Sequence, residues 1–190
     1  MKCLLLLVYN NPGRVVNVGS VNGLCAYPGL SIYSASKFAL EAFSDVLRFE
    51  VSKLGIKVVL LRPGDFARLT GLMLRQMHHA NDMWSLMSEK DRTFYKDYFD
   101  RYHGHIAENY GMTSPASFED SSLLQDFEEA LLSQSPSYSV TVAPLGFRTA
   151  FFIIGLMPPA VKDRFLDFLY AKVFKFDMNA YFPKCASSEK

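Results

Sequence analysis

The chain has 190 residues, of which 49% are apolar and 21% are charged, and its formal net charge is +1. This length is enough for one domain with a buried core, and the composition is that of an ordinary globular protein. A nearly neutral chain without a basic cluster does not fit a nucleic-acid partner. Three scattered cysteines, Cys3, Cys25 and Cys185, favour neither a disulfide framework nor a zinc site, and they suit a reducing compartment.

The first eight residues superficially resemble a signal peptide because an apolar run follows Met1 and Lys2. The run is shorter than the apolar region of a signal peptide, and residues 10–13 (Asn-Asn-Pro-Gly) hold no small-residue cleavage pattern. We therefore predict the end of a buried helix followed by a turn. No stretch reaches the length of a membrane-spanning helix.

The first predicted strand is Arg14–Val18, a β-branched run that follows a Pro-Gly turn. Residues 19–30 are rich in Gly, Ser, Asn and Pro and predict a loop. A long helix follows and ends near Leu54, where Gly55 closes it as a C-terminal cap. Its apolar residues recur at helical spacing and are predicted to face the core. They are Phe38, Ala39, Ala42, Phe43, Val46, Leu47 and Val51.

The second predicted strand is Ile56–Leu61, in which Lys57 is the only charged residue. A nearly continuous apolar run of this kind is typical of a strand buried on both faces of a parallel sheet. Strand, helix and strand together form a βαβ unit with a right-handed crossover. Pro63 and Gly64 then open a loop at the carboxyl end of the strand.

The remainder of the chain is predicted to be mainly helical. One helix covers about Glu89–Asn109, and a second runs from Pro115 or a little later to Gln134, after polar capping residues. Tyr138–Val142 alternates β-forming residues and predicts a third strand. Two short helices are expected around Pro158, followed by a loose tail.

Three side chains near the ends of the first two strands form a candidate catalytic group. Tyr33 and Lys37 are four residues apart, which places them on one face of the helix. An ammonium beside a phenol stabilises the phenolate, so such a tyrosine can exchange a proton with an alcohol or a carbonyl. Ser20, on the loop after the first strand, could hydrogen-bond the same substrate oxygen. A Tyr-x-x-x-Lys pair alone is more often a surface pair. Here, however, the serine follows one strand, the tyrosine begins the crossover helix, and Pro63 and Gly64 end the next strand. All three positions lie at the carboxyl edge of the sheet, where open α/β sheets bind ligands.

Segments 14–20, 33–43 and 62–64 resemble the short-chain dehydrogenase/reductase superfamily, as does the separation of Ser20 from Tyr33. The resemblance implies an α/β fold, namely the C-terminal part of a Rossmann-like doubly wound parallel sheet with an α-helical C-terminal extension. It implies that Tyr33 is the catalytic acid and base and that Ser20 orients the substrate oxygen. Lys37 would support Tyr33 and hold the nicotinamide ribose hydroxyls.

The same resemblance implies a nicotinamide cofactor, NAD or NADP. Pro63, Gly64 and the backbone near Phe66 would face the nicotinamide, together with Tyr33 and Lys37. Thr70 would be the hydroxyl that the family places after this loop, although Arg68 occupies the commoner threonine position. The resemblance is strongest to the branch of hydroxybutyrate and 17β-hydroxysteroid dehydrogenases, which implies a small apolar alcohol or ketone: a hydroxysteroid, a retinoid or a 3-hydroxy acid.

The family's N-terminal half is missing from this sequence. No Gly-x-x-x-Gly-x-Gly pattern occurs, although the family uses this turn to hold the pyrophosphate. We interpret residues 1–190 as one partial Rossmann-like domain, with substrate-loop helices in 66–112 and a helical extension over 144–190. Two functions remain open: an NAD(P)-dependent oxidoreductase, and a truncated inactive fragment or interaction remnant of such an enzyme.

The other candidate sites are weaker. Four histidines (His78, His79, His103 and His105) lack the pattern of a metal site, so no metal is predicted. Methionines near residues 73–87 are expected to line an apolar substrate pocket. The aromatic C-terminal region predicts either peripheral membrane contact or a dimer interface, and the complete enzyme is expected to be a homo-oligomer. Mitochondrial, endoplasmic reticulum and cytosolic locations all stay open.

We predict that this chain expressed alone does not bind NAD(H) measurably, because it lacks the strand–turn–helix that holds the pyrophosphate. Calorimetric titration of the purified chain with NAD(H) measures this directly. Binding at micromolar concentration would contradict the prediction.

Overall fold

The computed structural model describes residues 13–66, 75–110 and 122–172. The chain divides into two units, the first formed by Met1–Phe66 with Glu119–Leu156 and the second by Ala67–Phe118 with Met157–Lys190. Several sequence predictions fall outside the described residues, among them the helix end at 1–8, Thr70, the start of the helix expected from Pro115, and the C-terminal tail.

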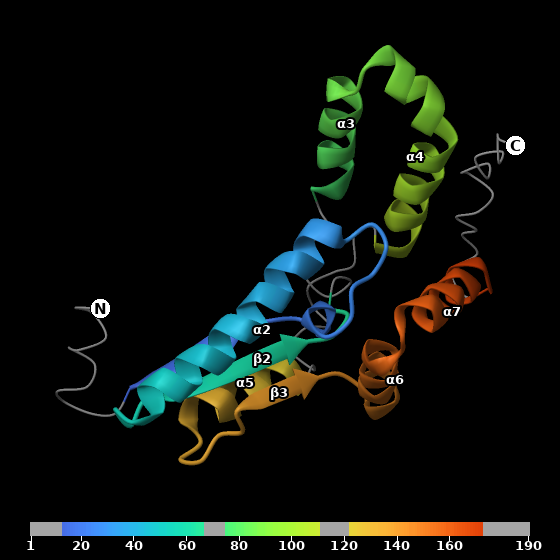
Figure 1. The fold of residues 1–190 in the computed structure, drawn as a ribbon. Helices are drawn as coiled ribbons and strands as arrows, with labels where there is room; N and C mark the ends of the chain where they lie inside the picture. Colours follow the sequence, from blue (N-terminus) through green and yellow to red (C-terminus); the bar gives the residue numbers. More distant parts are fainter. Residues whose placement is uncertain (1–12, 67–74, 111–121, 173–190) are drawn as a thin grey trace, which may run out of the picture. The chain divides into compact units, whose positions relative to one another are not determined.

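The first unit is built on a parallel sheet of three strands in the order β1-β2-β3. The strands are β1 (Arg14–Val18), β2 (Lys57–Pro63) and β3 (Ser139–Val142). Helix α2 (Ser31–Ser52) lies along one side of the sheet and α5 (Ser122–Leu132) along the other (Figure 1). The predicted α/β class and the three parallel strands are thus confirmed, with strand bounds that agree to within two residues.

The central strand β2 forms the core of this unit. Val58, Val59, Leu60 and Leu61 are all buried, as expected for a strand covered on both faces. Val51 of α2 and Ile56 pack with Val58 in one cluster. Full burial of a side chain such as Leu61 stabilises the fold by roughly 1.5–3 kcal/mol, so this strand anchors its neighbours.

The prediction for the buried face of α2 was wrong. Phe43 and Val46 were expected to face the core, but they are 55% and 57% exposed, and Phe38 is also exposed. Ser34 and Ser44 are buried instead. The physical reason is that polar side chains of α2 form hydrogen bonds with groups on the strands, which turns that side of the helix toward the sheet. Only the end of the predicted face, at Leu47 and Val51, packs on the sheet.

Two basic residues on neighbouring strands cap the C-terminal end of α5. Arg14 donates from Nη1 to the carbonyl of Ala130 at 2.7 Å and from Nη2 to that of Ser133. Lys57, the register partner of Arg14, donates from Nζ to the carbonyl of Gln134. Cations are favourable there because the last carbonyls of a helix lack intrahelical partners. These contacts fasten α5 to the start of the sheet.

In the second unit, α3 (Gln76–Leu86) and α4 (Glu89–Tyr110) form a helical hairpin (Figure 1). Arg92 closes the turn by donating to the carbonyls of Trp84 at 3.0 Å and Ser85 at 2.7 Å. Ring contacts then run from Trp84 to Phe99 (centroids 4.8 Å apart) and from Phe99 to His103 (4.3 Å). The helix predicted at Glu89–Asn109 is confirmed, whereas its expected role near the substrate stays a prediction.

Two further helices are α6 (Leu145–Leu156) in the first unit and α7 (Pro159–Lys172) in the second. They are the two helices expected around Pro158. None of the helices within residues 13–66, 75–110 and 122–172 combines the length and apolar character needed to cross a bilayer.

The buried His103 predicts an acid-sensitive α3–α4 hairpin. Burial lowers the pKa of His103, and its Nδ1 has no hydrogen-bond partner among the described residues. The unfolded chain therefore binds a proton more readily than the folded one, so stability is lost as the pH falls below about 6.5. Fluorescence of Trp84, the single tryptophan, follows this unit during thermal unfolding.

His103→Phe should remove much of the loss of melting temperature between pH 7 and pH 5. The matched control is His79→Gln, which changes an exposed histidine of the neighbouring helix and should leave the loss in place. An unchanged acid sensitivity in His103→Phe would show that other groups cause it.

Candidate active site

The carboxyl ends of the three strands are held together by two glycine backbones. Gly19, directly after β1, donates its N–H to the carbonyl of Leu61 at 2.7 Å. Gly64, directly after β2, donates to the carbonyl of Val142 at 2.9 Å. A Cβ on Gly64 would lie 2.9 Å from the Cβ of Ala143, so this close approach of β2 to β3 requires glycine.

Ser20 leaves this edge as the N-cap of a short 3-10 helix, η1 (Val21–Gly23). Its Oγ accepts a hydrogen bond from the N–H of Asn22 at 3.2 Å, and the residue is 5% exposed. This contact uses one lone pair of the hydroxyl and orients it. The O–H donor and the second lone pair can serve another partner.

Tyr33 and Lys37 occupy the first two turns of α2, as the sequence predicted. The Lys37 Nζ atom lies 5.6 Å from the centroid of the Tyr33 ring. The same ammonium donates to the carbonyl of Val18 at 3.0 Å and so ties α2 to the last residue of β1. Tyr33 is 37% exposed, which leaves its ring within reach of a ligand.

The loop that carries Ser20 lies on the segment of α2 that carries Lys37. A Cβ on Gly23 would come within 3.1 Å of the Lys37 carbonyl oxygen and 3.0 Å of the Glu41 side chain. The Lys37–Val18 bond and the approach of Gly23 to α2 thus place the loop after Ser20 beside the part of α2 that carries Lys37, one turn from Tyr33.

Polar contacts between α2 and the strands were missed by the sequence analysis. Asn17 donates from Nδ2 to the Ser44 Oγ at 2.9 Å, and Glu41 forms a two-bonded ion pair with Arg62. A signal was present, because Ser34, Lys37, Glu41 and Ser44 follow one another at helical spacing. That polar stripe is the side of α2 which faces the sheet.

Apart from Tyr33 and Lys37 on α2, the described residues predicted to face the cofactor lie at or just after the end of β2. Pro63 is its last residue, Gly64 bonds to β3 as described, and Phe66 donates its N–H to the Gly64 carbonyl at 3.1 Å. Thr70 lies outside the described residues. Within the described residues, no group of three His, Cys, Asp or Glu side chains could hold a metal ion.

Helix α6 covers the loop between Ser20 and Tyr33, which the sequence analysis did not foresee. The ring of Phe151 stacks on Tyr27 (centroids 5.3 Å apart) and on Phe147 (4.4 Å). Burial, and secondarily Cys25, raises the pKa of Tyr27 to about 12, so this phenol stays protonated near neutral pH. The loop between Ser20 and Tyr33 is therefore flanked by an aromatic cluster of Tyr27, Phe147 and Phe151.

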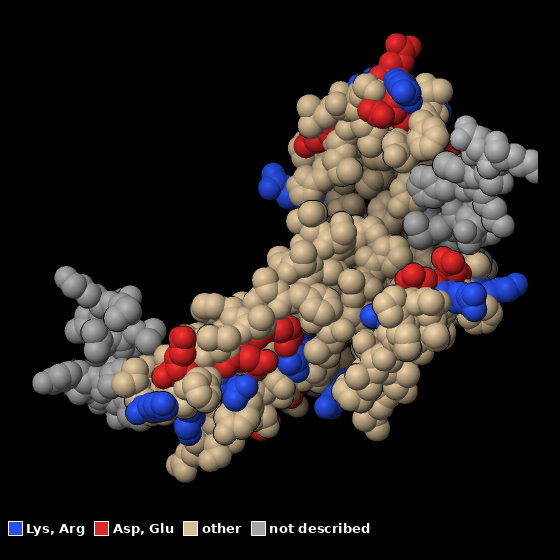
Figure 2. Space-filling model, viewed as in Figure 1, with Lys and Arg blue, Asp and Glu red and all other residues tan. Residues whose placement is uncertain are grey.

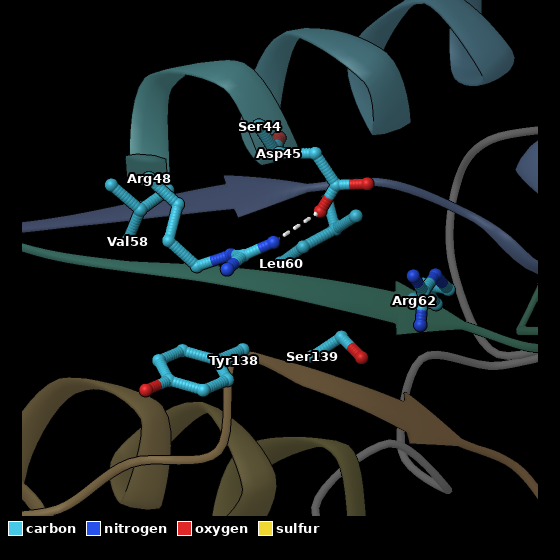
Figure 3. Close-up of a pocket in the computed structure, with 8 residues that line it drawn as sticks. All are labelled: Ser44, Asp45, Arg48, Val58, Leu60, Arg62, Tyr138 and Ser139. Atoms are coloured by element: carbon cyan, nitrogen blue, oxygen red, sulfur yellow. Dashed lines mark hydrogen bonds and ion pairs between the residues drawn. The ribbon is translucent and has the colours of Figure 1, made fainter. Parts of the chain in front are cut away.

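A separate pocket of about 150 Å³ opens between α2, β2 and β3 (Figure 3). Arg48 pairs there with Asp45 at 2.9 Å and lies over the Tyr138 ring, 5.0 Å from its centroid. Arg62 also borders this pocket, but Ser20, Tyr33 and Lys37 do not. Acidic and basic side chains are interleaved on this face of the first unit, with no expanse of one sign (Figure 2).

Comparison with known proteins identifies the family. Residues 2–78 match the sequence model of the short chain dehydrogenase family. Mitochondrial D-beta-hydroxybutyrate dehydrogenase of Rattus norvegicus is 38% identical over 138 residues, which are 71% of this chain and 39% of the relative. Human 17-beta-hydroxysteroid dehydrogenase type 2 is 32% identical over 148 residues, covering 71% of this chain and 35% of the relative.

Among solved structures, a short-chain dehydrogenase from Streptomyces avermitilis has a TM-score of 0.47 and 22% sequence identity, over 90% of this chain and 55% of that one. The chain spans well under half the length of the two enzymes named above. Through residues 2–78 it belongs to the short-chain dehydrogenase/reductase family.

The close approach at Gly64 predicts a strong effect of a single methyl group. Gly64→Ala places a Cβ against Ala143 and the carbonyl oxygen of Val142, so we expect a loss of about 1–3 kcal/mol in unfolding free energy. Gly146→Ala in α6 is the matched control, because its Cβ meets nothing within 4 Å and alanine favours a helix. Denaturant unfolding followed by circular dichroism compares the two variants. Equal stabilities would contradict the assigned contact.

Proposed function

We propose that this chain carries the proton-transfer residues of an NAD(P)-dependent oxidoreductase that interconverts a secondary alcohol and a ketone. Tyr33 is the general acid and base, Ser20 orients the substrate oxygen, and Lys37 supports Tyr33. The observation that carries the proposal is that the Lys37 ammonium makes two contacts at once. It lies beside the Tyr33 ring and donates to the carbonyl of Val18 at the end of β1.

The residues fit a nicotinamide cofactor at this edge. Val18 accepts from the Lys37 ammonium, which has three donors, so donors remain for the hydroxyls of a ribose. Gly64 and Phe66 continue the same edge after β2. When bound, the nicotinamide supplies the hydride acceptor or donor. Family membership implies NAD(P) dependence in general, and we propose no choice between the two nucleotides.

The residues of this chain provide the path of the proton. During oxidation of an alcohol, the substrate O–H proton passes to the oxygen of the Tyr33 phenolate while the carbon loses a hydride. During reduction, the Tyr33 hydroxyl returns the proton to the developing alkoxide. The Lys37 ammonium stabilises the phenolate form in both directions, and the Ser20 hydroxyl donates to the same substrate oxygen.

An apolar alcohol or ketone is the substrate class that we propose. The relatives named above act on a hydroxybutyrate and a hydroxysteroid by their names. The aromatic cluster of Tyr27, Phe147 and Phe151 at the loop between Ser20 and Tyr33 supports an apolar substrate. Aromatic rings bind a ligand mainly by removing apolar surface from water.

A second candidate is an interaction fragment that keeps the motif without turnover. The observation that favours it is the exposed apolar side of α2, where Phe38, Phe43, Val46 and Phe49 lie. Exposed apolar groups that lie together mark surfaces that other polypeptide covers. An absence of turnover in the experiment below would favour this candidate.

The deciding experiment joins this chain to a dinucleotide-binding strand–turn–helix, as in the longest gene product that contains it or in a fusion with the N-terminal half of a relative. Turnover of secondary alcohols is followed by absorbance of the reduced cofactor. Tyr33→Phe should lower kcat/KM by about 10²–10⁴-fold, because general acid–base catalysis contributes that much. Cofactor affinity and melting temperature should change little.

Tyr138→Phe is the matched control, since this exposed tyrosine lies beside the separate pocket, at the amino end of β3 and not at the carboxyl ends of the strands. It should retain full turnover. Undiminished activity of Tyr33→Phe would refute the role assigned to Tyr33.

A further inference from the structure

An ion pair between α2 and β2 has no role in the reaction proposed above. Arg62 donates from Nε and Nη2 to the two carboxylate oxygens of Glu41, both at 2.6 Å. The two side chains are only 16% and 15% exposed. Two parallel charge-assisted bonds fix both side chains in one geometry, unlike a single bond at the surface.

This ion pair lies against the loop that presents Ser20, defined here as residues 19–23 and called the Ser20 loop. A Cβ on Gly23 would lie 3.0 Å from both Cγ and Oε1 of Glu41. A Cβ on Gly19 would lie 3.7 Å from the Cγ of Arg62. The Gly23 end of the Ser20 loop therefore lies directly against the Glu41 carboxylate, and the Gly19 end lies near the aliphatic part of the Arg62 side chain.

We propose that Glu41 and Arg62 are positioning residues that hold the Ser20 loop, and with it the Ser20 hydroxyl, against α2. The consequence for catalysis rests on the proposed function. The mechanical part, that the pair keeps the loop closed, depends only on the contacts described.

Neutralising one partner of the ion pair removes the charge that compensates the other. The other charge then stays mostly buried without compensation, which is far more costly than the loss of a surface pair. Arg62 also borders the pocket between α2, β2 and β3, so water can enter next to the uncompensated charge (Figure 3). Hydration of that charge displaces the side chain on which the Ser20 loop rests.

Cys25 reports opening of this loop. It lies two residues after η1, its side chain is fully buried, and its N–H donates to the carbonyl of Val21 at 3.3 Å. A thiol reacts with an alkylating reagent only when it is exposed, so the alkylation rate measures how often the loop opens. The other two cysteines, Cys3 and Cys185, are replaced by serine so that Cys25 is the single thiol.

The experiment uses the full chain with these serine replacements and measures alkylation of Cys25 by iodoacetamide under native conditions. We expect Glu41→Gln and Arg62→Gln each to raise the rate at least about tenfold, which corresponds to about 1.4 kcal/mol in the opening equilibrium. Arg62→Lys keeps the charge with a single bond and should give an intermediate rate. Low concentrations of urea should leave these rates nearly unchanged, because the opening is local.

The Asp45–Arg48 pair provides the matched control. It also joins a carboxylate to an arginine and involves α2, but both partners lie on that helix and their side chains are 71% and 36% exposed. Asp45→Asn and Arg48→Gln should leave the alkylation rate of Cys25 unchanged. If either glutamine variant fails to fold, Glu41→Asp and Arg62→Lys decide the question, each with a rate above that of the unsubstituted pair.

Rates within twofold of the parent for all Glu41 and Arg62 variants would overturn the proposal. An equal increase in the Asp45 and Arg48 controls, or a rate that rises steeply with urea as global unfolding does, would also overturn it. The assay needs neither cofactor nor turnover, so a chain without activity leaves it intact.

The link to Ser20 is tested by a double-mutant cycle in the joined protein that shows turnover. If the pair acts through Ser20, Glu41→Gln lowers kcat/KM much less when Ser20→Ala is already present. Additive losses would show that Glu41 does not act through Ser20, while the result for Tyr33→Phe would be unaffected.

Discussion

The first unit depends on the polar seam between α2 and the sheet. Lys37, Glu41 and Ser44 reach a carbonyl of β1, a guanidinium of β2 and an amide of β1. A net contribution of about 1 kcal/mol is typical of a neutral hydrogen bond, and bonds to charged groups contribute more. A set of polar bonds of this kind is also directional, because only one rotation and one axial position of the helix satisfies all of them. The seam therefore fixes α2 more narrowly than apolar packing would.

That directional attachment explains how the site is assembled. Tyr33 precedes the seam by one turn of the same helix, so its position is set by contacts made further along α2. The Ser20 loop lies against the same side chains, with Gly23 beside Glu41 and Gly19 near Arg62. Strand ends, loop and helix thus share one set of polar anchors. A site on such anchors keeps its geometry even though Tyr33 itself remains partly exposed.

The strands and the Tyr33–Lys37 pair could be predicted because both depend on local pattern. The β-branched run of β1 and the apolar run of β2 need no knowledge of distant residues. The orientation of α2 could not be predicted in the same way, since its apolar and polar residues both recur at helical spacing. Which stripe faces the sheet is decided by Asn17 and Arg62, which lie outside the helix. The caps on α5 are beyond local pattern too, because Arg14 and Ala130 are 116 residues apart.

Ser34 shows that the start of α2 is not optimised for stability. Its Oγ is buried and has no hydrogen-bond partner among the described residues, while its N–H donates to the carbonyl of Leu30. An unsatisfied buried hydroxyl costs about 1–3 kcal/mol, and alanine would suit a helix better. The cost falls between Tyr33 and Lys37, in the segment to which we assign proton transfer. Departures from local stability rules concentrate at functional positions in natural proteins. The seam further along the helix tolerates such a departure, because it holds α2 in place without help from Ser34.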